Sequence, residues 1–197
     1  MPITATRKPP PITVDEFLNS TDRLGPGRHI LVDGVIYAMV PPSATHGIIQ
    51  LNVGSALKVH LQSRAMPCQV MGGAGVQPRL HKKTNVRIPD ITVACGPAPG
   101  PDDRLVTAPQ IVVEVLSPSH SNDSYLSINA CATIPSVMEM LAIDSSSRTV
   151  EYWQRGLDGA WPDEPSTIVG SGVVTFASID ISLSLADIYA GTHLSEA

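Results

Sequence analysis

The sequence predicts a mixed α+β fold in which a central mixed sheet is flanked by helices. Three stretches carry this prediction: an Asp-Gly hairpin at 29–40, a helical repeat of apolar residues at 43–64 and a β-branched run at 110–116. Strand and helix signals do not alternate regularly, as they would in a doubly wound fold. We therefore expect strands to outnumber helices, with the hairpin added to the central sheet as an extra N-terminal element.

The composition is typical of a folded chain with one sizeable core. Of the 197 residues, 43% are hydrophobic and 16% are charged, which excludes a disordered protein. Residues 1–11 are proline-rich and expected to be flexible, and residues 12–197 are expected to form one domain. No apolar run is long enough to span a bilayer, and no secretory signal is evident. We therefore expect a cytoplasmic protein without membrane contact.

Cysteine spacing and net charge argue against some kinds of structural and binding site. Cys68, Cys95 and Cys131 are widely spaced, which argues against a disulfide framework or a structural zinc site. We expect Cys95 and Cys131 to be small buried apolar residues. The net charge of −5 disfavours a protein that coats nucleic acid through charge alone. It leaves open an enzyme whose metal ions supply positive charge locally.

Local signals predict the N-terminal elements. Thr13 is a candidate N-cap for a short helix over 13–20. An Asp-Gly pair between the apolar runs 29–32 and 35–40 is the strongest short-range hairpin signal. Apolar residues at helical spacing in 43–64 predict a long amphipathic helix packed against the sheet.

The remaining chain is predicted to be mainly strands. These strands are expected at 68–78, 86–94, 110–116, 137–144, 149–155 and 171–179. A helix is expected at 121–133, where Pro135 stops it, and a short one within 182–191, where Gly191 is a candidate C-cap. A basic turn is expected to join the first two strands of this series.

Two acidic residues fall within apolar strands. Asp90 enters the strand "PDITVAC", and Glu114 lies in the middle of "IVVEVL". A buried carboxylate is costly unless something pairs with it or binds it. If strands 90–95 and 111–116 are neighbours, the two carboxylates meet, and a divalent cation would relieve their repulsion. Alternatively, Asp90 caps a turn and Glu114 pairs with an arginine.

Other polar residues each allow two interpretations. Candidate substrate-binding residues are Lys82, Lys83, Arg87, Ser117 and Ser119. The basic ones could instead form a solvated hairpin tip, and the serines could bond the backbone. His46, at the start of the long helix, could face the site or cap the helix at the surface.

Several segments together resemble a known family. "PDITVACGP", "IVVEVLSPS" and "IPSVMEMLAID" are similar, in this order, to motifs of the Uma-two family of restriction endonucleases, within the PD-(D/E)XK nuclease superfamily. "VDGVIYAMVPPSATHGIIQLNVGSAL" and "SLSLADIYAG" are also similar to that family, so the resemblance covers roughly 12–191. It implies a restriction-endonuclease-like core, hydrolysis of DNA phosphodiester bonds and a homodimer.

The resemblance also implies an active site. Asp90 and Glu114 correspond to the acidic residues of the family motif, which bind one Mg²⁺ or Mn²⁺ ion together with the Val115 carbonyl. The metal and a lysine would activate water, and the metal would stabilise the pentavalent phosphate. By this resemblance His46 is a further catalytic candidate.

Two polar groups of the family pattern are replaced in this chain. The position two residues after Glu114 is Leu116 rather than lysine. The family normally places its lysine on the following helix, four residues after an aspartate; Asp123 fits that aspartate, and the lysine position is then Ser127. The acidic residue expected in the first hairpin is Ile30.

These replacements leave the function open between two classes. Serine is neutral and short, and losing a positioned acid–base group lowers the rate by about 10²–10⁴-fold. Three arginines could in principle reach the site, although arginine is a poor base: Arg104, Arg148 and Arg155. The chain is either a weakened metal-dependent endonuclease or a catalytically lapsed nuclease-fold protein that acts as a binding or scaffold homodimer. A weaker alternative is a structural homodimer without ligand.

Overall fold

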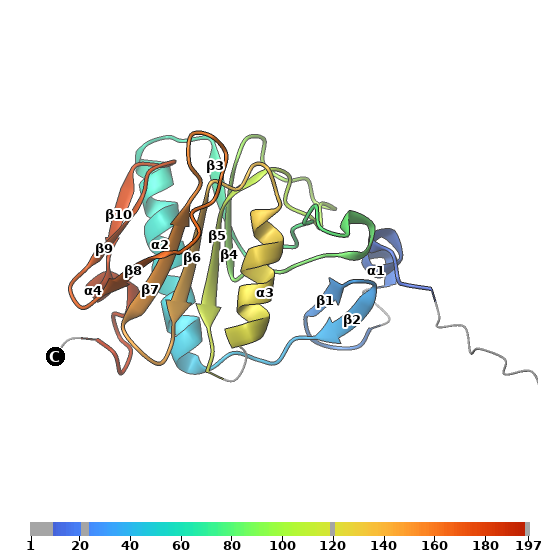
Figure 1. Ribbon diagram of the computed structural model, residues 1–197, viewed down its shortest axis with the longest axis horizontal. Coiled ribbons are helices and arrows are strands. Elements are labelled where there is room, and N and C mark those ends of the chain that lie inside the picture. Colours follow the sequence, from blue (N-terminus) through green and yellow to red (C-terminus); the bar gives the residue numbers. More distant parts are fainter. Residues whose placement is uncertain (1–9, 21–23, 119–120, 196–197) are drawn as a thin grey trace, which may run out of the picture.

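The computed structural model describes residues 10–20, 24–118 and 121–195. These parts of the chain form a six-stranded mixed sheet flanked by helices, with two separate hairpins (Figure 1). The predicted mixed α+β fold and its extra N-terminal hairpin are confirmed. Among the helices described, none has the length and apolar character needed to cross a membrane.

The central sheet contains one parallel pair among antiparallel neighbours. Its strands, in spatial order, are β3 (Cys68–Gly72), β4 (Ile91–Cys95), β5 (Pro109–Leu116), β6 (Glu139–Asp144), β7 (Thr149–Gln154) and β8 (Ser166–Val169). The parallel pair is β5 and β6, and helix α3 (Ser121–Ala132) makes the crossover between them. Such a crossover is needed because parallel strands cannot be joined by a tight turn.

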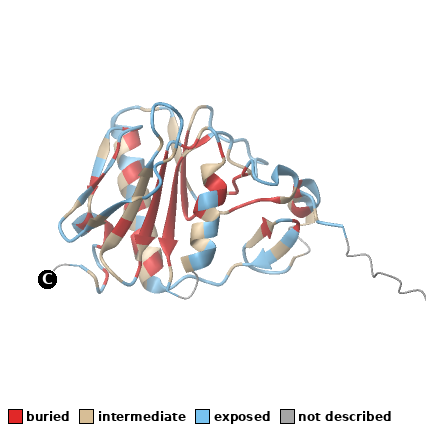
Figure 2. Cartoon of the chain, viewed as in Figure 1, coloured by how far each residue is buried: buried red, intermediate tan, exposed pale blue. Residues whose placement is uncertain are grey.

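Two apolar layers cover the sheet. Helix α2 (Ala44–Ser63) lies on one face with α4 (Leu185–Ile188) and the hairpin of β9 (Val173–Phe176) and β10 (Ile181–Ser184), and α3 lies on the other face (Figure 1). The central strands are therefore almost continuously buried (Figure 2), which explains the unbroken apolar run of β5.

Local signals account for the N-terminal elements. Strands β1 (His29–Val32) and β2 (Val35–Ala38) pair across Asp33 and Gly34, which have φ values of 49° and 80°. Two consecutive positive φ values are what a type I′ hairpin requires. Beneath this hairpin, α1 (Val14–Ser20) packs against β1.

Side-chain caps begin the first two helices, and Thr13 is the one that the sequence predicts. The Thr13 hydroxyl accepts a hydrogen bond from the Glu16 N–H at 3.2 Å, and the Glu16 carboxylate accepts one from the Thr13 N–H at 2.8 Å, which completes a capping box. Ser43 accepts from the His46 N–H at 3.2 Å at the start of α2. The predicted helices therefore begin where their capping residues indicate.

The predicted strands 68–78 and 86–94 are longer than the observed ones. β3 ends at Gly72 and β4 begins at Ile91. Between them the chain leaves the sheet, forms the 3₁₀ helix η2 (Lys82–Thr84) and pairs Val86 with Leu31 of β1. In this stretch Val76 packs with β5 and α3 in the layer on the α3 face of the sheet, while Val86 packs beneath the β1–β2 hairpin.

The expectation of no disulfide is wrong for one pair of cysteines. Cys68 and Cys95 form a disulfide, with their Cα atoms 3.8 Å apart. The antiparallel register of β3 and β4 places the two residues directly opposite each other, although 27 positions separate them along the chain. Cys131 is a free, buried cysteine as expected.

Candidate active site

The end of the β4–β5 ladder brings the two predicted carboxylates together. Ile91 is paired with Val113, and Asp90 immediately precedes that first rung. The Val115 N–H donates to Asp90 Oδ2 at 2.8 Å. The Asp90 carboxylate thus accepts the hydrogen bond of the Val115 N–H, which has no backbone partner on β4 because the pairing of the two strands ends at Ile91 and Val113. The predicted adjacency of these strands is confirmed.

His46 reaches Asp90 from the start of α2. Its Nε2 lies 3.0 Å from Asp90 Oδ1, and its Nδ1 lies 3.4 Å from the Ser117 hydroxyl. The residue is only 6% exposed. One turn later on α2, Gln50 donates to the Asp90 carbonyl oxygen at 2.7 Å. Of the two interpretations of His46, the structure supports the one in which it faces Asp90.

Glu114 lies on β5 between Asp90 and α3. The Ser127 hydroxyl donates to Glu114 Oε1 at 2.6 Å, so the position expected to hold lysine is next to this carboxyl group. Burial, reinforced by the charge of Asp90, raises the pKa of Glu114 to about 8, against the opposing effects of the Ser127 hydrogen bond and the Arg87 charge. The surroundings of Glu114 therefore favour its protonated form when no cation is present.

Arg87 is a buried cation beside these groups. It is 8% exposed, and its charge acts on Glu114, Asp123 and Asp33. Burial lowers the pKa of the Arg87 guanidinium, and the neighbouring acidic groups oppose that effect. Its Nε has no hydrogen-bond partner among the described residues. Arg87 is therefore a buried positive charge in the neighbourhood of several acidic groups.

The donor chemistry of this site fits a hard divalent cation. Asp90 and Glu114 offer carboxylate oxygens, which Mg²⁺ and Mn²⁺ prefer. The Val115 carbonyl lies on the same strand edge as the Val115 N–H that contacts Asp90, because the N–H and C=O of one strand residue point the same way. Within the described ranges, no three His, Cys, Asp or Glu side chains are grouped to hold a metal. Further ligands would come from the backbone, water or substrate.

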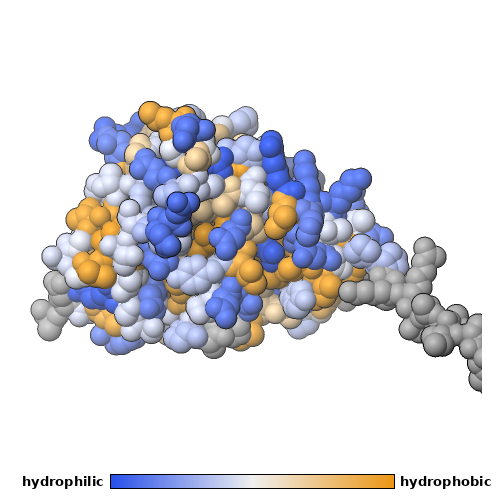
Figure 3. Space-filling model, viewed as in Figure 1, coloured by the Kyte–Doolittle hydropathy of each residue, from blue (hydrophilic) through white to orange (hydrophobic). Residues whose placement is uncertain are grey.

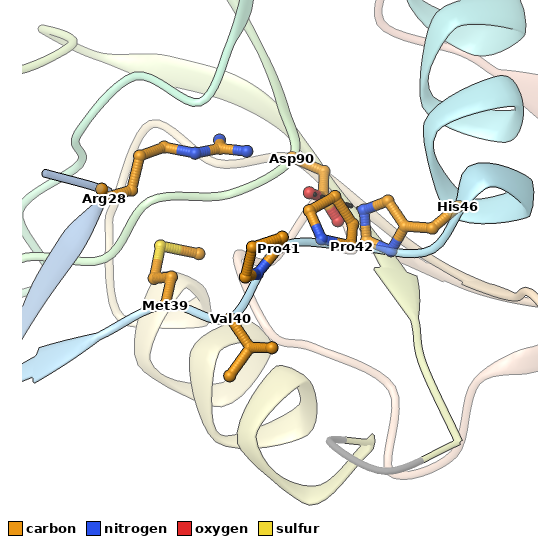
Figure 4. Close-up of a pocket in the computed structure, with 8 residues that line it drawn as sticks. Arg28, Met39, Val40, Pro41, Pro42, His46 and Asp90 are labelled. Carbon is orange, nitrogen blue, oxygen red and sulfur yellow. Dashed lines mark hydrogen bonds and ion pairs between the residues drawn. The ribbon is translucent and has the colours of Figure 1, made fainter.

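A pocket opens beside Asp90 (Figure 4). Its volume is about 330 Å³, and its lining consists of Gly27, Arg28, Met39, Val40, Pro41, Pro42, His46 and Asp90. Figure 3 shows hydrophobic surface gathered between α3 and the β1–β2 hairpin, where Val40 and Leu126 are exposed. The pocket thus has an apolar wall after β2 and a polar floor at His46 and Asp90.

Some predicted residues lie elsewhere. Lys82 and Lys83 belong to η2, which is held to the β1–β2 turn by a hydrogen bond of 2.9 Å from the Gly34 N–H to the Thr84 carbonyl. Ile30 is paired with Tyr37 within the hairpin. None of Lys82, Lys83 and Ile30 lines the pocket at Asp90. Ser119 lies outside the described residues.

The arginines considered from sequence make contacts outside this pocket. Arg104 donates to the Leu18 carbonyl, and Arg155 donates to the Ala132 carbonyl while its guanidinium lies 4.6 Å from the centre of the Trp161 ring. Arg148 does not line the pocket either. Sequence reasoning missed Arg28, because nothing in the sequence shows that a residue just before β1 faces Asp90. Gln50 could have been found from its position one turn after His46.

Comparisons with known proteins agree with this architecture. A chain of 28% identity over 153 residues, covering 77% of this chain and 78% of the relative, is an uncharacterized protein from Synechocystis sp. (strain ATCC 27184 / PCC 6803 / Kazusa). A crystal structure from Anabaena variabilis ATCC 29413, described as "a putative nuclease belonging to DUF820", has a TM-score of 0.69 and 18% identity, covering 91% of this chain and 98% of its own. That similarity shows a shared fold.

The family comparison extends over most of the chain. The family model of Uma2, described as "Putative restriction endonuclease", matches residues 14–179. This range includes α1, both hairpin strands, α2, the whole central sheet and α3, and therefore the Asp90–Glu114 site. The chain belongs to the Uma2 family.

Proposed function

We propose that this protein is a divalent-metal-dependent endonuclease that hydrolyses phosphodiester bonds of DNA at a reduced rate. The observation that carries the proposal is the meeting of Asp90 and Glu114 at the end of the β4–β5 ladder, where the charge of Asp90 helps to raise the pKa of Glu114 to about 8. Membership of the Uma2 family, described as "Putative restriction endonuclease", supports the same reaction class, as does the shared fold of the Anabaena protein described as "a putative nuclease".

The residues of the site would divide the work as follows. Asp90 and Glu114, with the Val115 carbonyl, would hold one Mg²⁺ or Mn²⁺ ion. When bound, that ion would supply Lewis-acid activation of water and neutralise phosphate charge. His46 fixes one Asp90 oxygen through a contact of 3.0 Å, and Val115 fixes the other. Glu114 would give up its proton to become a ligand.

Ser127 explains why the proposed rate is reduced. Its hydroxyl donates to Glu114, but it cannot offer the positive charge that a lysine would place beside the attacking water. A missing acid–base group lowers the rate by about 10²–10⁴-fold. The proposed enzyme therefore relies mainly on charge neutralisation and substrate positioning.

The test is cleavage of supercoiled plasmid and single-stranded DNA with Mg²⁺ or Mn²⁺. Asp90→Asn and Glu114→Gln keep the size and the acceptor oxygen of each side chain but remove its charge, so both should abolish cleavage. Asp163→Asn is a matched control because Asp163 is exposed in the loop between β7 and β8. Cleavage by Asp90→Asn or Glu114→Gln at the rate of the unmodified protein would contradict the proposal.

The alternative is a catalytically lapsed protein that binds DNA or a partner as a homodimer. The Ser127–Glu114 hydrogen bond favours it, because that bond occupies a carboxyl oxygen needed for metal. Sedimentation equilibrium and DNA binding, measured together, test this alternative. A dimer that binds DNA but never cleaves it, with either metal, would support the lapsed protein over the enzyme.

A further inference from the structure

Arg28 faces Asp90 across the pocket. It immediately precedes β1, and its guanidinium points over the cavity toward Asp90 and His46 (Figure 4). The Met39 N–H donates to the Arg28 carbonyl at 2.8 Å, so the hairpin backbone fixes both sides of the pocket mouth. The Arg28 side chain is exposed to solvent.

The Arg28 guanidinium packs directly against the backbone of Gly73. A Cβ atom at Gly73 would overlap Arg28 Nη1, and the φ of +62° at Gly73 is one that glycine adopts without strain. The Gly73 N–H donates to the Asp90 carbonyl oxygen at 3.2 Å, the same atom that receives the Gln50 hydrogen bond. The surface on which Arg28 rests is therefore bonded directly to Asp90.

The Arg28 charge has no acidic partner within the described ranges. The ion pairs there join His46 to Asp90, Arg64 to Asp180 and His81 to Asp33. Arg87, the other arginine near the site, is buried and does not line the pocket. Arg28 is thus the cation of this pocket that an incoming anion can reach.

We propose that Arg28 binds a phosphate of the substrate and supplies positive charge that Ser127 cannot provide. The inference rests on the proposed function and deepens it by assigning the pocket as a phosphodiester subsite. A guanidinium suits this role because it binds phosphate oxygens in a bidentate manner and stays charged. The apolar wall from Met39 to Pro42 would contact the sugar and base beside that phosphate.

Binding is measured first, so that the test does not depend on cleavage. Fluorescence anisotropy with a labelled short duplex and a labelled single strand, in chelator and over a range of salt concentrations, gives affinity and salt dependence. Arg28→Ala should weaken binding, and the slope of log K against log salt should become shallower by about 0.7–0.9. Arg28→Lys should keep the slope, since its charge remains.

Two further variants control for trivial effects. Arg64→Ala removes an exposed arginine that lies at the C-terminal end of α2 and pairs with Asp180 at 3.4 Å, so it should leave the slope unchanged. Gly73→Ala places a methyl group where the Arg28 guanidinium lies, so it should displace the guanidinium and reproduce the weaker binding of Arg28→Ala. In cleavage with Mn²⁺, Arg28→Ala should be slower by about 10²-fold.

The outcomes separate this inference from the proposed function. If the unmodified protein cleaves DNA and Arg28→Ala behaves like Arg64→Ala, the Arg28 inference is overturned while the nuclease stands. If the unmodified protein binds DNA but never cleaves it, and Arg28→Ala still makes the slope of log K against log salt shallower, the phosphate subsite stands and the nuclease proposal fails. Failure to bind either nucleic acid overturns the inference.

Discussion

At the scale of single residues, Glu114 has the environment in which pH should matter most. Its carboxyl group is buried beside Asp90, and its pKa is raised to about 8 in the folded state. In the unfolded chain it ionises near 4.5. Between these two values the unfolded state holds fewer protons, so this group lowers the free energy of unfolding as the pH rises.

Glu114→Gln should therefore stabilise the metal-free protein at neutral and higher pH. Glutamine mimics the protonated carboxyl group and can still accept the Ser127 hydrogen bond. In chelator, the gain should be small near pH 4.5, grow as the pH rises toward 8 to on the order of a few kcal/mol, and then level off. Urea unfolding at several pH values measures it; a gain independent of pH would contradict the assignment.

Ser127 is the residue at which activity should be recoverable. Ser127→Lys places an ammonium group beside Glu114, where the family pattern has its lysine. We expect cleavage with Mn²⁺ to rise by about 10²-fold. Asn129→Lys is the matched control, because it adds the same charge on the exposed face of α3. Equal rates in the two variants would show that Ser127 is not the missing catalytic position.

At the scale of elements, a disulfide links the edge strand β3 covalently to its neighbour β4. Cys68 and Cys95 are separated by 27 positions, and closing such a loop stabilises the folded state by about 3–4 kcal/mol in the chain-entropy description. Reduction should lower the urea midpoint of the unmodified protein. Cys68→Ala/Cys95→Ala should be insensitive to reductant, and an equal response in both proteins would argue against the bond.

Elements with local determinants were predictable from sequence, and those with distant determinants were not. The Asp33-Gly34 turn and the Thr13 cap depend on neighbouring residues. The Cys68–Cys95 bond depends on strand register, and the early end of β3 depends on distant contacts, in which Val76 packs with α3 and pairs with Arg87. β8 escaped prediction because its four residues are mostly exposed and too few to show a regular alternation of apolar and polar residues.

The candidate site was likewise predictable where local sequence determines it and not where distant contacts do. Asp90 and Glu114 each stand out as a charge within an apolar strand, so their pairing follows once the strands are placed side by side. The role of Ser127 was inferred from a family pattern, and its contact with Glu114 is visible only in the fold. Arg28 requires the position of Gly73 as well, and no local pattern links these two residues.

At the scale of the whole molecule, metal binding should stabilise the fold by mass action. A ligand at about 100 times its dissociation constant adds about 2.7 kcal/mol, which for a chain of this size raises Tm by about 5–10 °C. Mn²⁺ should therefore raise the Tm of the unmodified protein and not that of Glu114→Gln. Equal shifts in the two proteins would place the ion elsewhere.

The contact between Asp90 and Val115 has a consequence for how this protein can change. Asp90 accepts a hydrogen bond from the backbone of β5 through its Oδ2 atom, and it is also a proposed metal ligand. A substitution at this position would therefore disturb both the fold and the site. Ser127 lies at the partly exposed surface of α3, and its hydroxyl donates to Glu114, a residue of the same site, rather than to the backbone of the sheet. If the protein is the nuclease that we propose, its descendants can lose or regain catalysis at position 127 while Asp90 persists. The presence of Asp90 alone would then be a poor guide to which of them cut DNA.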